Sequence, residues 1–170
     1  MRTVRSRFEV DSPSDPAVES FEAFYRREYH AVLTIARVLT SDRAQAEDLT
    51  QESFLAAYAA WSEISSPATW VRATVTHKAM SWWRRMYAAR RAVSRLSPAQ
   101  DPGDIPEDTE EFWGAVRRLP KRQAQSLTLY YLEDQSTREI AAVLGCDEST
   151  VRIHLSRGRK ALASQLRTTE

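Results

Sequence analysis

The chain has 170 residues, a length that fits one ordinary domain or two small ones. Only four residues are Gly, none is Asn, and β-branched residues form no alternating runs, so we expect an all-α protein. The single cysteine, Cys146, excludes a disulfide or a thiolate cluster within the chain, which suits a reducing cytoplasm. No stretch is apolar for long enough to cross a bilayer, and no apolar segment follows the basic N-terminal residues. We therefore expect a cytoplasmic protein without membrane insertion.

The net charge of +1 conceals an uneven distribution of charge along the chain. Residues 64–100 hold seven Lys/Arg and no acid, residues 101–111 hold six acids and no base, and residues 112–170 hold ten bases and six acids. Two basic segments separated by an acidic one are typical of a protein that grips a polyanion at two places. On charge alone, two solvated basic faces explain the pattern equally well.

Proline and glycine positions divide the chain into two expected helical domains. Residues 1–20 contain two Pro among Ser and Asp and indicate a flexible N-terminal extension. Residues 96–106, LSPAQDPGDIP, combine three Pro, one Gly and several acids, which predicts a flexible acidic linker. The expected domains are therefore residues 21–95 and residues 107–170.

The first domain is expected to contain three helices. Helical periodicity begins near Phe21, and a second helix is expected to start after Asp42 and to run to about Trp61. A third helix is expected from about Trp70, after a loop at residues 62–69.

The second of these helices has a largely polar face. Asp48, Gln51, Glu52 and Leu55 are spaced at i, i+3, i+4 and i+7, so they lie on one side of a helix. An ordinary solvated face has the same pattern, so the spacing alone does not show that a partner binds there.

The third helix has two distinct sides. Its expected buried stripe consists of Val71, Val75, Ala79, Trp82 and Met86. Its other side carries aromatic, polar and cationic residues, namely Trp70, Thr74, His77, Lys78, Ser81, Arg84 and Arg85. Aromatic and cationic side chains on one exposed face suit unstacked bases beside a phosphate backbone.

Residues 136–162 carry the strongest local signal. Ser136 and Glu139 form a predicted capping box at the start of a short helix, and Gly145 follows that helix where a left-handed residue is favoured. The next helix has a side suited to burial, made by Val151, Leu155, Gly158 and Leu162. Its candidate DNA-binding residues are Ser149, Thr150, Arg152, Ile153, Ser156, Arg157 and Lys160. The pattern predicts a helix-turn-helix whose second helix enters the major groove, although unrelated helical hairpins share it.

Two blocks of the sequence resemble the extracytoplasmic-function sigma factors of the sigma-70 family. Residues 119–162 resemble region 4, with matches at Glu139-Ile140-Ala141, Leu144-Gly145 and Thr150-Val151-Arg152. AEDLTQESF, residues 46–54, resembles region 2.2, and the helix expected from Trp70 resembles regions 2.3 and 2.4. The two blocks stand in the family's order and together cover nearly everything except the N-terminal extension and the linker.

The resemblance implies an alternative sigma factor that binds bacterial RNA polymerase core and directs promoter-specific initiation. Asp48, Gln51 and Glu52, with Leu55 beside them, are implied to dock on the β′ clamp helices, and the C-terminal domain on the β flap. The third helix is implied to capture the melted −10 element, with the loop Ile64–Thr69 helping to form a base pocket. The helix-turn-helix is implied to recognise the −35 element. An anti-sigma factor is a possible further partner, and no cofactor, metal or catalytic group is expected.

Some residues depart from the family pattern, and parts of the sequence also fit other functions. His77 and Ser81 stand where Asn and Asp are frequent, so the −10 preference is expected to be unusual. Gly158 stands where Ala is usual, at a cost of about 1 kcal/mol in helix propensity. The competing interpretation is a free-standing helix-turn-helix regulator, which would bind duplex DNA without polymerase. An enzyme is disfavoured, because the chain has three His, one Cys and no glycine-rich phosphate loop.

Overall fold

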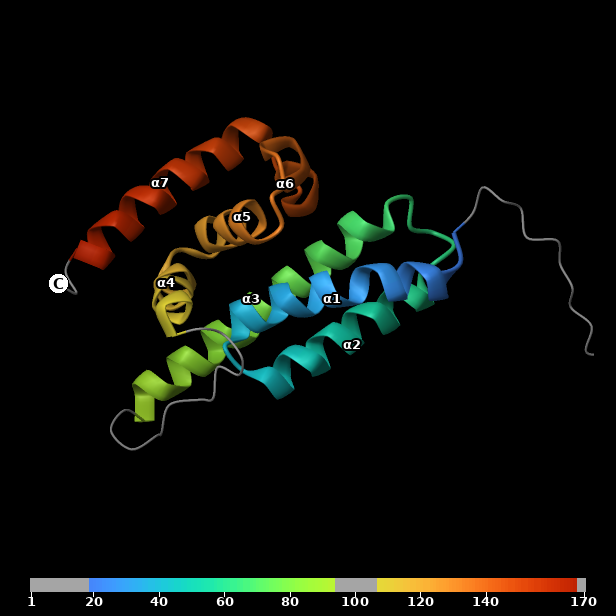
Figure 1. Cartoon of the computed structure of the whole chain (residues 1–170), viewed down its shortest axis with the longest axis horizontal. Helices are drawn as coiled ribbons and strands as arrows, with labels where there is room; N and C mark the ends of the chain where they lie inside the picture. The colour runs from blue at the N-terminus through green and yellow to red at the C-terminus, as the bar shows by residue number, and fades with distance from the viewer. Residues whose placement is uncertain (1–18, 94–106, 168–170) are drawn as a thin grey trace, which may run out of the picture.

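The computed structural model describes residues 19–93 and 107–167, and the secondary structure there is helical (Figure 1). The helices in chain order are α1 (Phe21–Thr40), α2 (Arg43–Ala59), α3 (Pro67–Val93), α4 (Glu107–Arg118), α5 (Lys121–Leu132), α6 (Thr137–Leu144) and α7 (Glu148–Arg167). The predicted all-α class is confirmed. The expected acidic linker at residues 96–106 and most of the expected N-terminal extension lie outside the described residues.

Helices α1, α2 and α3 pack against one another and form the N-terminal bundle. The side chains of Ser20 and Asp42 cap α1 and α2 by accepting hydrogen bonds from backbone N–H groups of the first turns, at 3.2 and 2.9 Å. Between these helices the buried rings of Phe24 and Phe54 lie with their centroids 5.9 Å apart. Aromatic rings bury large apolar areas, so this pair fixes how α1 and α2 pack.

The third helix starts earlier than expected, and its buried face is turned relative to the expected stripe. It begins at Pro67 and not near Trp70, because proline lacks the N–H that a first helical residue leaves unpaired. Val71, Val75 and Ala79 are buried as predicted, but Trp82 and Met86 are only half-buried. Thr76 and Met80 are fully buried instead. The buried face is turned because α3 packs against both α1 and α2, which periodicity along one helix does not reveal.

Helices α4 to α7 form the C-terminal bundle, in which the predicted helix-turn-helix is present. Ser136 Oγ accepts a hydrogen bond from the backbone N–H of Glu139 at 3.3 Å, and the Glu139 carboxylate accepts one from the backbone N–H of Ser136 at 2.8 Å. Gly145 ends α6 with a φ of 63°, the left-handed conformation that favours glycine. The predicted apolar side of α7 is buried, with Val151, Leu155 and Leu162 at most 5% exposed.

The two bundles pack against each other. Helix α5 contacts α1 and α3, α6 contacts α3, and α4 contacts α1. Figure 1 shows α7 on the outer side of the molecule, with α4 and α5 between it and the N-terminal bundle. The buried Arg117 of α4 donates a hydrogen bond of 2.7 Å to the carbonyl of Val38, in the last turn of α1, where helical carbonyls lack partners within the helix. No helix in the described ranges is long and apolar enough to cross a membrane.

Two helical glycines of the C-terminal bundle provide a test of this packing. A Cβ at Gly158 would lie 2.7 Å from Cδ1 of the buried Leu127, whereas a Cβ at Gly114 would find its nearest neighbour at 3.6 Å. We expect Gly114→Ala to raise the free energy of unfolding by up to about 1 kcal/mol through helix propensity. We expect Gly158→Ala to lower it by about 1 kcal/mol, because the overpacking cost exceeds the same propensity gain. Chemical denaturation measures both changes, and equal stabilisation by the two variants would show that Leu127 moves aside without cost.

Candidate nucleic-acid interface

The outer side of α7 presents a polar and basic surface to solvent. Arg152, Ser156, Arg157 and Lys160 are exposed, and Ile153 is 48% exposed. Of the remaining predicted −35 residues, Ser149 is exposed and Thr150 is half-buried. The buried side of the same helix faces the bundle core, so these residues project from a rigid support. An exposed helix with this chemistry is suited to the major groove, where Arg recognises guanine and Ser or Lys holds bases or phosphates.

Two neighbouring residues on α7, Arg159 and His154, contribute less to this basic surface. The guanidinium of Arg159 lies 4.8 Å from the Tyr130 ring centroid, and its Nε donates a hydrogen bond of 2.9 Å to the Tyr131 hydroxyl. Burial, followed by the charges of Arg122 and Arg157, lowers the pKa of the half-buried His154. Arg159 is therefore committed to the aromatic residues of α5, and His154 favours its neutral form.

The predicted −10 residues lie along α3, but part of this face touches the C-terminal bundle. Lys121 Nζ lies 3.1 Å from Nδ1 of His77 and donates a hydrogen bond of 3.2 Å to Oγ of Ser81. A guanidinium nitrogen of Arg84 donates one of 2.9 Å to the carbonyl of Leu119. Of the other cations on this face, Lys78 pairs with Glu52 of α2 at 2.8 Å, and Arg85 is exposed. The structure thus brings His77, Ser81 and Arg84 together under the start of α5.

The loop before α3 and the start of that helix line an open pocket of about 430 Å³. Its lining includes Ser66, Thr69 and Trp70 from this side and Ala142 from α6. The hydroxyl of Ser66 donates a hydrogen bond of 3.0 Å to that of Thr69, which ties the loop to the first turn of α3. Thr74 is half-buried one turn further along and donates to the carbonyl of Trp70 at 2.9 Å. The loop therefore lines this open pocket at the start of the predicted −10 face.

The predicted polymerase-binding residues of α2 are all exposed, and Leu55 is 67% exposed. Gln51 Nε2 is 3.4 Å from the Tyr25 hydroxyl, and Glu52 holds the ion pair with Lys78. Asp48 completes this exposed face. This surface is free to meet another protein.

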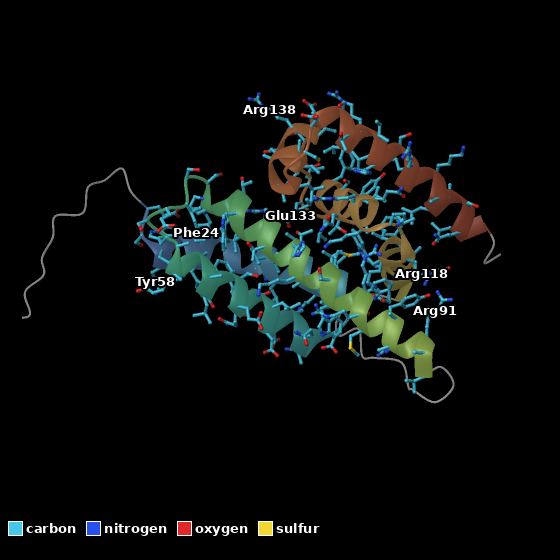
Figure 2. All side chains as sticks on the ribbon, turned by 180° about the vertical axis from the view of Figure 1, so that it is seen from behind. Phe24, Tyr58, Arg91, Arg118, Glu133 and Arg138 are labelled. Carbon is cyan, nitrogen blue, oxygen red and sulfur yellow. The ribbon has the colours of Figure 1, made fainter. Side chains whose placement is uncertain are left out.

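An apolar groove that the sequence pattern did not predict extends this surface. The groove has a volume of about 280 Å³ and is lined by Phe21, Tyr25, Gln51, Phe54, Leu55 and Tyr58. Tyr58 is 64% exposed, and Figure 2 shows it at the end of the N-terminal bundle far from Arg91 and Arg118. The spacing of Leu55 and Tyr58, three residues apart on α2, was the available signal. Tyr25 and Phe21 come from α1, so only the packed structure reveals their contribution.

The pKa of His77 depends on the contact between the two bundles. His77 remains exposed, but the partial burial of its ring is the largest cause that lowers its pKa, and the charges of Lys121 and Arg122 lower it further. Because the packed arrangement disfavours the imidazolium, its stability falls as the pH drops through the ordinary histidine range. We expect Lys121→Ala to raise the His77 pKa while leaving that of His154, which Arg122 and Arg157 affect, unchanged. Titration of the imidazole C–H resonances by NMR measures both values, and an unchanged His77 pKa would contradict the observed contact.

Comparisons with known proteins agree with the two-block organisation. The family model "Sigma-70 region 2" matches residues 24–91, and the model "Sigma-70, region 4" matches residues 109–162. The ECF RNA polymerase sigma factor SigC of Mycobacterium tuberculosis is 32% identical over 151 residues, covering 84% of this chain and 81% of that protein. The probable RNA polymerase sigma factor RfaY of Xanthomonas campestris is 31% identical over 151 residues, covering 81% of this chain. The chain spans only 38% of the length of that relative.

A solved structure supports the same fold. The co-crystal structure of the sigma factor RpoE with the anti-sigma factor NepR from Bartonella quintana contains a chain that matches with a TM-score of 0.65 at 23% identity. The match covers 90% of this chain and 100% of that one. Together with the two family models in their proper order, these relatives identify the chain: it belongs to the extracytoplasmic-function sigma factors of the sigma-70 family, which are transcription initiation factors and not enzymes.

Proposed function

We propose a division of roles among three faces of this alternative sigma factor, which directs promoter-specific transcription initiation. The α2 face would bind the β′ clamp helices of core polymerase, and the C-terminal bundle would bind the β flap. The α3 face and the preceding loop would hold the melted −10 strand, and the outer side of α7 would recognise the −35 element. The protein would act in the cytoplasm, where bacterial DNA and polymerase meet.

The observation that carries this proposal is the separation of three chemically different faces on one chain. The α2 face combines acidic, amide and apolar groups, whereas α7 is basic and hydroxylated. The α3 face adds aromatic residues to cations, which suits unstacked bases. Binding energy distributed over such faces can open a duplex without a catalytic group in the chain.

The apolar groove would supply much of the binding free energy of the α2 face. Protein interfaces gain most of their affinity from a few buried apolar or aromatic anchors surrounded by polar contacts. Leu55 and Tyr58 are such anchors beside the groove, while Asp48 and Glu52 form a polar rim. We propose that the polymerase contact extends from the predicted polar residues into this groove.

An anti-sigma factor is a further proposed partner. The similar chain described above was crystallised in a complex with an anti-sigma factor. An inhibitor that covered the exposed α2 face or the exposed side of α7 would block a proposed polymerase or promoter contact. This part of the proposal is supported by the exposure of both faces.

Charge reversal at Asp48 tests the α2 face. We expect Asp48→Arg to reduce core polymerase binding by at least tenfold, because it places a cation where the clamp contact is proposed to need an anion, a mismatch worth more than about 1.4 kcal/mol. Glu22→Arg, an equal charge change at an exposed residue of α1, is the matched control and should bind like wild type. Binding of labelled core polymerase and initiation in vitro measure the effect. Equal binding by both variants would place the polymerase contact elsewhere.

Truncation at Arg157 tests the α7 face. We expect Arg157→Ala to leave core binding intact and to weaken initiation from a −35-dependent promoter about tenfold, within the range for loss of one good base contact. Arg26→Ala, which removes an exposed cation from α1, serves as the control. Promoters selected in vitro from a randomised library provide the templates. Initiation unaffected by Arg157→Ala would remove this residue from −35 recognition.

A further inference from the structure

Within the described part of α7, Ile153 is the one large apolar side chain that is exposed. Val151 and Leu155 are buried two positions before and two positions after it, at 0% and 3% exposure. Because successive residues of a helix are separated by about 100°, a residue two positions from each buried neighbour points to the opposite side. Ile153 therefore projects away from the core of the C-terminal bundle and is 48% exposed.

The neighbours of Ile153 on the surface of α7 are polar. Residues three and four positions away on a helix are surface neighbours, and here they are Ser149, Thr150, Ser156 and Arg157. A single apolar side chain among hydroxyls and a cation does not form the contiguous apolar patch that is typical of a protein-binding site. It instead suits a partner surface that is polar except at single points.

The major groove of DNA is a surface of that kind. Its base edges present hydrogen-bond donors and acceptors, and the C5-methyl group of thymine is the apolar group among them. A methyl group on C5 of cytosine projects into the same groove. The N-terminal turns of a recognition helix contact the base edges, and Ile153 lies in the second turn of α7, which begins at Glu148. Ile153 is therefore placed where a methyl group on a base can be contacted.

The position and shape of the Ile153 side chain are fixed before any DNA binds. An isoleucine in a helix has one strongly preferred χ1 rotamer because its Cβ is branched. The helix itself is held close to the bundle, since a Cβ at Gly158 would lie 2.7 Å from Cδ1 of Leu127. An apolar contact made by such a side chain loses little conformational entropy on binding.

We propose that Ile153 is a specificity-determining residue of the −35 contact and that it recognises a 5-methylpyrimidine, thymine or 5-methylcytosine, through van der Waals contact with the methyl group. This inference rests on the proposed −35 function of α7 and deepens it. Arg157 lies four residues further along the helix, a rise of about 6 Å, and base pairs are spaced by about 3.4 Å. The methylated base is therefore expected within about three base pairs of the base that Arg157 contacts.

Replacement of thymine by deoxyuridine tests the contact, because it removes the methyl group and leaves every hydrogen-bonding group of the base in place. The protein is the full chain assembled with core polymerase, and the probe is a duplex promoter selected from a randomised library. Each −35 thymine, on either strand, is replaced in turn, and competition binding gives the affinity. We expect one thymine whose replacement weakens wild-type binding about fourfold, the fold-change that corresponds to about 0.8 kcal/mol for one buried methylene-sized group.

Two variants assign that methyl group to Ile153. Ile153→Ser removes the apolar branches, and serine has a helix propensity similar to that of isoleucine. This variant should bind the thymine and deoxyuridine promoters with equal affinity at the sensitive position. Ile153→Val is the matched control, because it keeps the branched apolar shape, and it should retain most of the discrimination. At every other −35 thymine the effect of deoxyuridine should be the same for all three proteins.

A cytosine promoter distinguishes the two sources of the methyl group. The sensitive thymine is replaced by cytosine or by 5-methylcytosine, each paired with guanine. Methylation should strengthen wild-type binding about fourfold relative to the unmethylated cytosine promoter and should leave Ile153→Ser binding unchanged. If cytosine methylation has no effect while deoxyuridine weakens binding, the recognition of 5-methylpyrimidines as a class is overturned.

The contrary results for Ile153 differ from those for the proposed function. Equal wild-type binding to every deoxyuridine promoter would overturn the contact, and discrimination that persists in Ile153→Ser would assign the methyl group to another residue. Loss of core polymerase binding by Ile153→Ser, with unchanged base discrimination, would show that this side chain meets protein and not DNA. Wild type that selects promoters without a shared −35 sequence would instead overturn the proposed function of α7, and the inference with it.

Discussion

The arrangement of the two bundles depends on how the buried charge of Arg72 is paired where the bundles pack together. Arg72 faces carboxylates from two different bundles, and all three groups are largely removed from water. Removing one partner of a buried pair is costly, yet the pair itself offers little net stability because both ions lose their hydration. The pKa of Glu133 is raised because burial, which disfavours the charged carboxylate, outweighs the hydrogen bond from Arg72, which favours it. The cluster therefore selects one docking geometry, and apolar burial and hydrogen bonds such as the one from Arg117 to Val38 supply the adhesion.

The small size of each bundle explains why one chain can carry several chemically distinct exposed faces. A helical unit of about 60–75 residues buries a thin core, so each helix commits one side to packing and leaves the others free. In α7 the buried side is narrow, and Gly158 allows it to approach Leu127 closely. That approach leaves Arg152, Ile153 and Arg157 on the exposed surface. The same shortage of core favours packing of the two bundles against each other when neither is held by polymerase.

Sequence patterns predicted the features that depend on neighbouring residues in the chain. The capping box at Ser136, the left-handed Gly145 and the apolar side of α7 are determined within one or two helical turns, and each is confirmed. The start of α3 at Pro67 and the burial of Met80 were missed. The burial of Met80 depends on packing against α1 and α2, which the periodicity of a single helix does not reveal. The apolar groove was missed for a related reason, since Phe21 and Tyr25 reach it from another helix.

The seam between the bundles was the feature least accessible to sequence reasoning. Arg72, Arg84, Lys121 and Glu133 are charged, and charged residues in a single-helix pattern indicate a solvated surface. Only the packed structure shows that Arg84 and Lys121 lie against the opposite bundle and that Glu133 is largely buried. The chemistry that suits α3 to nucleic acid also suits it to this seam, because cations and hydroxyls that satisfy phosphates and base edges equally satisfy a helix-end carbonyl or a carboxylate. A face whose chemistry suits a polyanion is thus also well suited to bind part of its own chain.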